Sequence, residues 1–274
     1  MIERFKNSPK RILFVRNFAN LFYIAQDFLL YIVSYFFVNK KNRQKKITII
    51  TAADSSHFQT SKQLISSIQK HEKSTNIVFY DLGLSDSQSK EIMNLGLEYQ
   101  KFKFNDYPSF MKLSEPDAGA YAWKPQIINN ELKKSNNLII WMDAGNILTS
   151  DLKKIRYIIS KFGFYSPLSN GYVKQWTHET TLYELNVIDS VYKKRMLNAA
   201  IIGIDPQNKK TQSLISKWGN LSLNKDLILP KGAGKKNHRW DQSLLTILFY
   251  KNYKKVLFPR THKFFGVITH QDID

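Results

Sequence analysis

The stretch "IIWMDAGNIL" (Ile139 to Leu148) places a carboxylate directly after a continuous apolar run. Such a short run is typical of a fully buried strand. An Asp at its end is costly to bury alone, because an isolated charge in an apolar interior must be neutralised or paired. We therefore expect Asp143 to meet a turn amide, a basic side chain or a metal that carries a ligand. Gly145 would let that ligand approach the backbone closely.

Further strands and helices alternate on the N-terminal side of this stretch. The pattern predicts strands at 46–54, 76–84 and 97–104 and helices at 60–72 and 85–96. Alternation of this kind indicates an α/β fold with a mostly parallel central sheet flanked by helices. Ligands in such folds bind beyond the carboxyl ends of the strands, so Ala53, Asp54, Asp81 and Asp143 are expected to face one crevice. In the alternative interpretation, each Asp caps the turn or helix that follows it.

Composition limits the classes of function. A chain of 274 residues that is 43% hydrophobic is long enough for one large core and one main domain. The net charge of +19 favours a polyanionic partner, which includes nucleic acid, an anionic membrane surface and phosphorylated substrates. The absence of cysteine excludes disulfides and thiolate metal sites, and it fits a reducing compartment.

Residues 1–46 differ from the rest and are treated as a separate N-terminal segment, followed by a catalytic domain at 47–274. They carry ten Lys or Arg and two acidic residues, around an apolar and aromatic run from Leu21 to Val38. Asp27 interrupts that run, and an Asp near a helix centre costs about 2.5–3.5 kcal/mol on insertion. We expect an amphipathic helix on an anionic membrane surface, which predicts a cytoplasmic protein peripheral to the inner face. The alternative is a helix packed on the protein's own core.

Two basic segments are candidate phosphate sites. "YAWKPQIINNEL" (Tyr121 to Leu132) places Lys124 at a helix start, where free amides and the dipole favour anions. The alternative is an exposed lysine beside a Trp123 that anchors the core. "KGAGKKNHR" (Lys231 to Arg239) lacks the spacing of a P-loop, so it is a basic loop that closes over phosphates or a solvated turn.

Three later segments carry candidate sugar or metal ligands. "RMLNAAIIGIDP" (Arg195 to Pro206) is predicted as a strand, with small residues near Asn198 that leave room for a sugar or for a helix. In "NHRWDQSLLTILFY", Asp241 and Gln242 start a helix, with Asp241 as a sugar ligand or as the N-cap. His262 and His270 complete an oxygen-rich metal site or are structural.

Together, strand-end Asp54 and Asp81 and the motifs "WKP", "WMDAGN", "NAAIIGID" and "HRWDQSLL" resemble a GT-A type glycosyltransferase, which has a Rossmann-like sheet. The resemblance spans about residues 47–270 as scattered motifs, and it is greatest to the glycogenin and bacterial galactosyltransferase-like group. It implies transfer of a hexose from a nucleotide-diphosphate donor, UDP-sugar above all, to a glycan or lipid-linked acceptor, with retention favoured.

The resemblance also implies roles for individual residues. The base, ribose and phosphates of the donor would contact Ala53, Asp54, Asp81, Lys124 and Arg239. The catalytic residues, which touch the donor sugar, would be Asn198, Asp241 and Gln242. The ligands of Mn²⁺ or Mg²⁺ would be Asp143, Asn146, His262 and His270. The usual Asp-x-Asp element has a second acidic residue, but this chain has Gly145 at that position. The metal ion would therefore depend on the diphosphate for some of its oxygen ligands.

Two other functional classes compete with this one. A basic chain with several Asp residues also fits a metal-dependent nuclease or a nucleic-acid-binding protein, but the aromatic residues do not interleave with the basic runs, so no nucleic acid is expected. A noncatalytic membrane-binding protein would account for residues 1–46 but not for the strand-end carboxylates.

Overall fold

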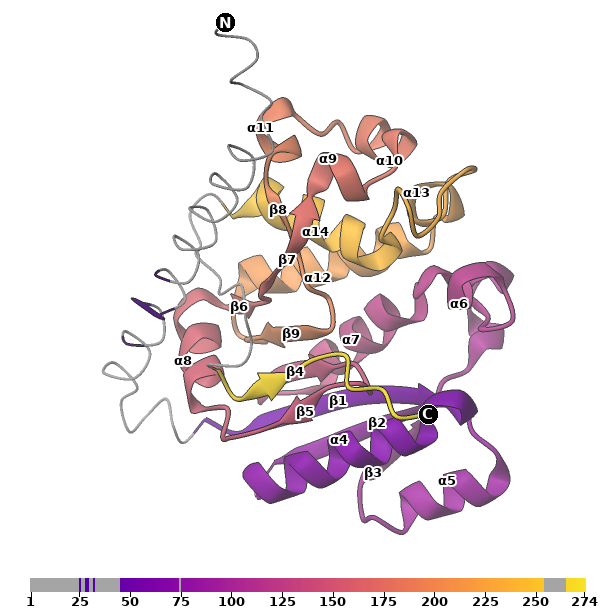
Figure 1. Ribbon diagram of the computed structural model, residues 1–274, viewed down its shortest axis with the longest axis vertical. Coiled ribbons are helices and arrows are strands. Elements are labelled where there is room, and N and C mark those ends of the chain that lie inside the picture. The colour runs from indigo at the N-terminus through magenta and orange to yellow at the C-terminus, as the bar shows by residue number, and fades with distance from the viewer. Residues whose placement is uncertain (1–24, 26–27, 30–31, 33–44, 74, 254–264) are drawn as a thin grey trace, which may run out of the picture.

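The structure is a computed structural model that describes residues 25, 28–29, 32, 45–73, 75–253 and 265–274 (Figure 1). The predicted membrane-surface helix at 21–38 lies outside the described residues, apart from four isolated positions. Within the described part of the chain, no helix has the length and apolar character needed to cross a membrane. The division at residue 46 stays a prediction.

A six-stranded sheet with the order β3-β2-β1-β4-β9-β6 forms the centre of the molecule. Its first four strands in this order are parallel to one another, and β9 runs antiparallel to β4. The edge strand β6 runs antiparallel to β9 and therefore in the same direction as β4. The strands are β1 (Ile47–Asp54), β2 (Asn76–Gly83), β3 (Glu98–Lys101), β4 (Leu138–Met142), β6 (Phe164–Tyr165) and β9 (Ile201–Ile204). The predicted α/β fold with a mostly parallel sheet is confirmed.

Helices cover the sheet because its central strands are apolar on both sides. All five residues of β4 are buried, and seven of the eight positions of β1 are buried. The main helices are α4 (Phe58–His71), α5 (Asp86–Met93), α7 (Trp123–Lys134), α8 (Lys153–Phe162), α12 (Lys209–Ser222) and α14 (Trp240–Asn252). Helix α4 packs on β1, α8 packs on β4 and β9, and α12 contacts both α7 and α14 (Figure 1).

Short elements complete the chain. Two-stranded ladders join β5 (Ile147–Leu148) to β10 (Val267–Ile268), and β7 (Leu168–Tyr172) to β8 (Arg195–Leu197). The short helices are η1 (Ser55–His57), η2 (Phe104–Asp106), η3 (Ser109–Met111), α6 (Pro116–Ala120), α9 (Val173–Trp176), α10 (Glu179–Glu184), α11 (Asp189–Tyr192) and α13 (Lys225–Ile228). A second apolar cluster under α9, α10 and α11 includes Val173, Leu182 and Ile247.

The prediction of one strand from Arg195 to Pro206 is wrong in detail. It forms two strands, β8 and β9, which lie in different sheets and are separated by a turn at 198–200. The side-chain oxygen of Asn198 accepts a hydrogen bond from the backbone N–H of Ala200 at 2.9 Å. Asn favours such side-chain turns over a ladder, which explains the break. The strand predicted at 97–104 is likewise shorter, because η2 begins at Phe104.

A left-handed turn precedes α7. Five consecutive residues, 117–121, have φ between 52° and 65°, and Gly119 is the only glycine among them. This conformation costs L-residues roughly 1–2 kcal/mol each. The indole N–H of Trp123 donates to the carbonyl of Ala118 at 3.1 Å, which ties the turn to the first residue of α7. Strain of this kind tends to persist where surrounding packing enforces it, often beside functional sites.

Candidate active site

A cavity of about 460 Å³ opens beyond the carboxyl ends of β1 and β4, and we call it the strand-end cavity. Most of the side chains that the sequence singled out meet there. The predicted site residues that line it are Ala53, Asp54, Lys124, Asp143, Asn146, Asn198, Arg239, Asp241, Gln242 and His270. Their functional roles stay predictions, but segments that are far apart in the sequence supply one shared surface.

Lys124 lies at the centre of the polar part of the strand-end cavity. Its Nζ is 3.0 Å from Oδ1 of Asp143 and 3.5 Å from Oδ2 of Asp241. The same nitrogen is 3.5 Å from the carbonyl oxygen of Ala199. The rings of Tyr121 and Trp141 flank it, each with its centroid at 5.7 Å. Only 4% of the residue is exposed, so the alternative of a solvent-exposed lysine is wrong.

The two carboxylates keep this buried ammonium charged. Burial alone would lower the pKa of Lys124, but the charges of Asp143 and Asp241 outweigh it and hold the pKa above its ordinary value. Asp241 is also buried, and desolvation raises its pKa to about 6 even though Lys124 acts in the opposite direction. The group therefore combines one permanent cation with a carboxyl that titrates near neutrality.

Asp143 finds both of its partners on the protein itself. Its Oδ1 accepts a hydrogen bond from the indole N–H of Trp141 at 2.7 Å, in addition to the ion pair with Lys124. Its backbone N–H donates to the carbonyl of Ala200 at 2.9 Å. The side chain is 37% exposed, so one side of this carboxylate still faces the cavity. The charge at the end of β4 is thus stabilised by a lysine and an indole.

The turn at 198–200 contacts several polar groups of the site through its backbone carbonyls. The carbonyl of Ala200 accepts from the backbone of Asp143 and from Nδ2 of Asn146, the latter at 2.6 Å. The carbonyl of Ala199 faces Lys124. The small side chains of Ala199 and Ala200 allow this close approach to β4. Asn198 therefore lines the cavity, and its side chain stabilises the turn at 198–200.

Three buried polar atoms at the cavity make no hydrogen bond within the described residues. They are Oδ1 of Asn146, Oδ2 of Asp241 and Nε1 of Trp240. Oδ2 of Asp241 still forms the ion pair with Lys124, although at 3.5 Å its geometry is not that of a hydrogen bond. Buried polar atoms without partners are uncommon in native proteins. Two acceptors and one donor that line a cavity are suited to a ligand rich in hydroxyl groups.

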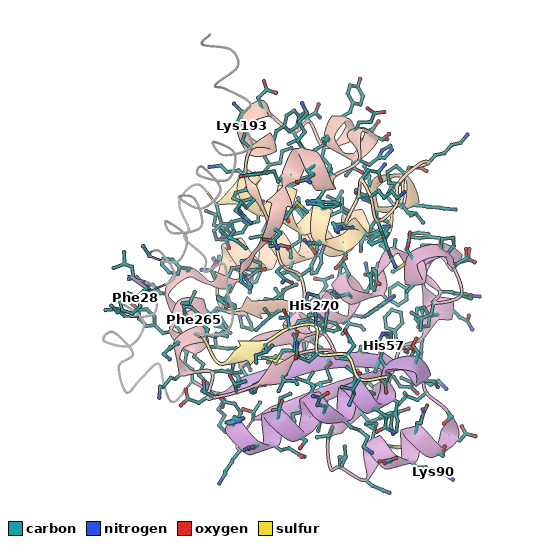
Figure 2. The ribbon with its side chains drawn as sticks, in the orientation of Figure 1. Phe28, His57, Lys90, Lys193, Phe265 and His270 are labelled. Atoms are coloured by element: carbon teal, nitrogen blue, oxygen red, sulfur yellow. The ribbon has the colours of Figure 1, made fainter. Side chains whose placement is uncertain are left out.

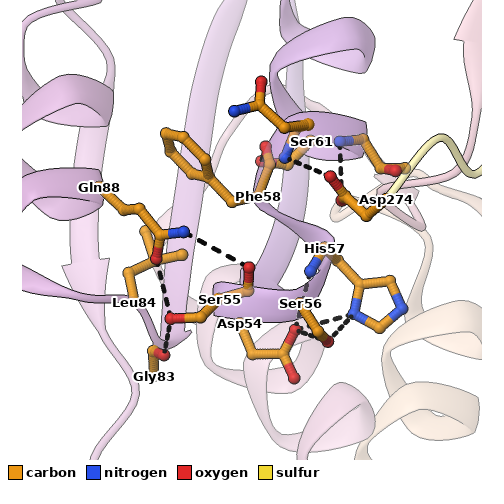
Figure 3. A network of polar contacts seen from close by, with 12 residues as sticks. Asp54, Ser55, Ser56, His57, Phe58, Ser61, Gly83, Leu84, Gln88 and Asp274 are labelled. Carbon is orange, nitrogen blue, oxygen red and sulfur yellow. Dashed lines mark hydrogen bonds and ion pairs between the residues drawn. The ribbon is translucent and has the colours of Figure 1, made fainter.

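Asp54 and His57 form an ion pair at the β1 side of the cavity (Figure 3). Nδ1 of His57 lies 2.8 Å from Oδ1 of Asp54, which also accepts from the His57 backbone N–H at 3.1 Å. The hydrogen bond from His57 lowers the pKa of Asp54 to about 2, and the same bond raises the pKa of His57. Asp54 therefore caps η1, as the alternative interpretation held, and lines the cavity as well.

The segment from His270 to Asp274 adds two side chains to the rim. The N–H of Gln271 donates to the carbonyl of Gly145 at 2.7 Å, and the carboxylate of Asp274 accepts from the backbone N–H groups of Gln59 and Thr60 at 3.0 Å each (Figure 3). His270 and Asp272 both line the cavity. Figure 2 shows His270 and His57 on the same part of the molecule, near the ends of β1 and β4.

Arg239 comes to the cavity from the basic loop at 231–239. Its guanidinium lies 3.9 Å from the ring centroid of Trp176, and burial lowers its pKa. The neighbouring His238 is fully buried and anchors the loop, with Nδ1 3.1 Å from the His178 N–H and Nε2 3.0 Å from the Ile228 carbonyl. The loop thus has a fixed end rather than a fully solvated one. Gln242 follows in the first turn of α14.

Of the predicted site residues that the structure describes, Asp81 is not brought to the cavity. Asp81 is buried, and its carboxylate accepts from the backbone N–H groups of Gly83 and Leu84 and from the hydroxyl of Tyr99. It stabilises the turn between β2 and α5, whereas its neighbour Leu82 lines the cavity. His262 lies outside the described residues. The donor-binding role of Asp81 and the metal role of His262 stay predictions.

The described residues do not fit a protein-held divalent cation at Asp143. The resemblance to GT-A enzymes implies Mn²⁺ or Mg²⁺, which need several oxygen or imidazole ligands. Across the described part of the chain, no group of three or more His, Asp or Glu side chains is arranged to hold a metal ion. Oδ1 of Asp143 already forms an ion pair with Lys124 and accepts a hydrogen bond from the indole N–H of Trp141. The metal assignment stays a prediction for which these residues supply no ligand set.

Some residues of the cavity were not expected from the sequence. His57, Trp240 and Asp272 line it, together with Tyr121 from the left-handed turn. Trp240 begins α14 with a φ of 40°, a strained value for a bulky residue. The only local signal was the position of His57 three residues after a strand-end Asp. Asp272 had none, because its place depends on contacts across the whole fold.

Residues 14–129 match the model of a family described as "Protein of unknown function (DUF1647)". No curated protein matches this sequence. Among solved structures, the chain is similar to the bifunctional glycosyltransferase WbbM, with 16% identity, coverage of 76% of this chain and 38% of that chain, and a TM-score of 0.49.

Two further solved structures are similar at the same level. The glycosyltransferase GlyE of Streptococcus pneumoniae TIGR4 has 13% identity, coverage of 78% and 45%, and a TM-score of 0.44. The galactosyltransferase LgtC, solved with donor and acceptor sugar analogs, has 15% identity, coverage of 74% and 70%, and a TM-score of 0.46. The chain spans less than half the length of WbbM and of GlyE. Its activity therefore has to be inferred from its own site.

Proposed function

We propose that this chain is a glycosyltransferase that moves a sugar from a nucleotide-diphosphate donor to an acceptor hydroxyl. The observation that carries the proposal is the convergence of Lys124, Asp143 and Asp241 in one cavity beyond the carboxyl ends of β1 and β4. The switch point of an open α/β sheet is where such folds bind nucleotides. A cavity of about 460 Å³ is within the range that holds small-molecule ligands.

The lining of the cavity divides into regions that suit the parts of such a donor. Ala52, Ala53 and Leu82 form an apolar region at the ends of β1 and β2, which suits a flat nucleobase. Arg239 is the permanent cation of the lining that suits the diphosphate, whereas the ammonium of Lys124 already faces three protein oxygens. Asn146 Oδ1, which makes no hydrogen bond within the described residues, and the carboxylate of Asp143, which is 37% exposed, suit the hydroxyl groups of the sugar.

Sugar transfer needs charged and polar groups at the atoms whose charge changes during the reaction. The bond between the anomeric carbon and the diphosphate oxygen breaks, and its electron pair leaves with the nucleoside diphosphate. A bond forms between the anomeric carbon and the acceptor oxygen, and the proton of the acceptor hydroxyl passes to the departing diphosphate. Cations fixed near the leaving group stabilise the charge that develops there, and fixed dipoles of this type contribute about 10²–10³ in rate each. Asp241 lines the cavity, and we assign it the role that the resemblance implies, which is to orient the sugar.

Other parts of the proposal rest on sequence alone. A UDP-sugar donor, a glycan or lipid-linked acceptor, a retaining course and attachment to an anionic membrane surface are the expectations that follow from the resemblance and from residues 1–46. A metal-dependent nuclease is less well supported, because it needs a cluster of metal-binding acids and the described residues provide none.

A nucleotide panel tests the proposal directly. Purified protein is heated in the presence of UDP, GDP, CMP and the corresponding sugar nucleotides, with and without added Mn²⁺. A ligand that binds the native state raises the melting temperature, and sugar release from the same donor then measures turnover. The proposal predicts a shift with at least one nucleotide diphosphate. It is rejected if no nucleotide in the panel shifts the transition.

A further inference from the structure

The ammonium of Lys124 occupies a site that is built like a cation site. Oxygens from three separate elements surround it, namely Asp143 after β4, Asp241 in α14 and the carbonyl of Ala199 in the turn after β8. The three oxygens lie 3.0–3.5 Å from Nζ, and an ammonium group has three N–H donors. Each donor therefore has an oxygen within reach.

The surroundings fix the ammonium in place. Tyr121 and Trp141 present ring faces to it, and these contacts favour a cation further when water is excluded. The Trp141 indole also binds Oδ1 of Asp143, so the carboxylate is held on the side of the lysine. Lys124 itself is carried near the start of α7, which packs against α12.

A divalent cation at the same carboxylates would have to displace or approach a fixed positive charge. Two charges of the same sign a few ångströms apart repel each other strongly where water is excluded. Carboxylate oxygens that already hold an ammonium also contribute fewer free lone pairs to a metal. The ammonium of Lys124 thus holds the position between the two carboxylates that a metal ion would need.

We propose that Lys124 is the resident cation between Asp143 and Asp241 and that this site binds its nucleotide ligand without a divalent metal. The part that concerns the nucleotide rests on the function proposed above. The part that concerns the metal does not, because it follows from the two ion pairs alone. The two parts therefore have separate tests.

Binding of Mn²⁺, followed by the loss of its free electron paramagnetic resonance signal, tests the metal part. At pH 8, the wild type should show no Mn²⁺ binding at micromolar concentrations of the ion. Lys124→Met removes the ammonium and leaves two carboxylates, so this variant should bind Mn²⁺ at least about tenfold more tightly than the wild type. Lys90→Met is the matched control, because Lys90 is an exposed residue of α5 that does not line the cavity and should leave the signal unchanged (Figure 2).

The results separate the two parts of the proposal. Micromolar Mn²⁺ binding by the wild type overturns the metal part, and so does a folded Lys124→Met variant that binds no more tightly than wild type. If that variant does not fold, the wild-type titration still decides.

Isothermal titration of the wild type with UDP in EDTA, and again in Mn²⁺, tests the nucleotide part. Equal affinities support it, and binding only with Mn²⁺ overturns it. If UDP binds in neither buffer, the use of a UDP donor fails and the Mn²⁺ titration alone judges the role of Lys124.

Discussion

The carboxylate of Asp272 lies against the α-carbon of Gly145, in the space that a side chain at position 145 would fill. The backbone N–H of Gln271 binds the carbonyl of the same glycine at 2.7 Å. A residue near the C-terminus therefore supplies a carboxylate to the cavity at the position that a side chain of residue 145 would occupy. The absence of a side chain at Gly145 is what allows this arrangement.

Gly145→Ala should weaken ligand binding much more than it weakens the fold. The added methyl group would meet the side chain of Asp272, which is exposed and free to move, and Gly145 has no positive φ. We expect a loss of less than about 1 kcal/mol in the free energy of unfolding. UDP affinity by isothermal titration should fall at least about tenfold, because the methyl group enters the cavity. Unchanged affinity would show that ligands do not approach this part of the backbone.

Asp143→Asn should strongly reduce sugar transfer and preserve the structure. The amide oxygen still accepts from Trp141, but the negative charge that fixes the ammonium of Lys124 is lost. We expect transfer to fall by about 10²–10³. Activity is compared with Asp106→Asn, an exposed acid of η2 that does not line the cavity, and circular dichroism checks the fold. Wild-type activity in the Asp143 variant would remove this residue from the site.

Local patterns in the sequence were sufficient to predict β1, β2 and β4, but not the length of β3 or the break between β8 and β9. β1 and β4 are buried, largely apolar runs that end at or just before an aspartate, so Asp54 and Asp143 could be placed at one edge of the sheet before any contact was known. The same reasoning failed for Asp81, because a strand-end Asp that binds the turn amides after it has the same local sequence as one that faces a cavity.

The contacts that define the site could not be read from the sequence. Lys124 and Asp241 are separated by more than a hundred residues, and no periodicity links them. The left-handed turn at 117–121 contains alanine, aspartate and tyrosine, whose intrinsic preferences oppose it, so it exists because tertiary packing enforces it. Both features depend on long-range contacts, which a single sequence does not encode locally.

The stability of the protein should reveal the titration of Asp241. Burial raises the pKa of this carboxyl to about 6, so the folded state binds its proton more tightly than the unfolded state does. The contribution of this proton to stability is present at low pH and is lost as the pH rises from about 4 to about 6. Asp241→Asn removes this dependence, so the variant should gain stability relative to wild type across that range, by roughly 3 kcal/mol at most. Urea denaturation at several pH values measures it, and a constant difference would contradict the assignment.

His238 should show the opposite dependence. Burial lowers the pKa of its imidazole to about 4, so the unfolded state binds the proton more tightly between about pH 6.5 and pH 4. This contribution to stability is present above the unfolded pKa and is lost as the pH falls. His238→Gln should lower stability at neutral pH by about 1–3 kcal/mol, because it disturbs the bonds to His178 and Ile228. It should also flatten the acid limb of the denaturation profile, and an unchanged limb would show that His238 is not its source.

Gly119→Ala tests whether packing holds the left-handed turn in place. A β-carbon on Gly119 would overlap the backbone carbonyl of Met111, and backbone atoms cannot move aside as a flexible side chain can. We expect a loss of at least about 2 kcal/mol in the free energy of unfolding, from overpacking in a turn that is already strained. Gly234→Ala is the control, because no heavy atom lies within 4 Å of its added carbon and its φ is not positive. Since Ala118 and Tyr121 of this turn line the cavity, the Gly119 variant should also lose the thermal shift with nucleotide, whereas the control keeps it. Equal stability of the two variants would mean that the turn is free to rearrange and does not shape the site.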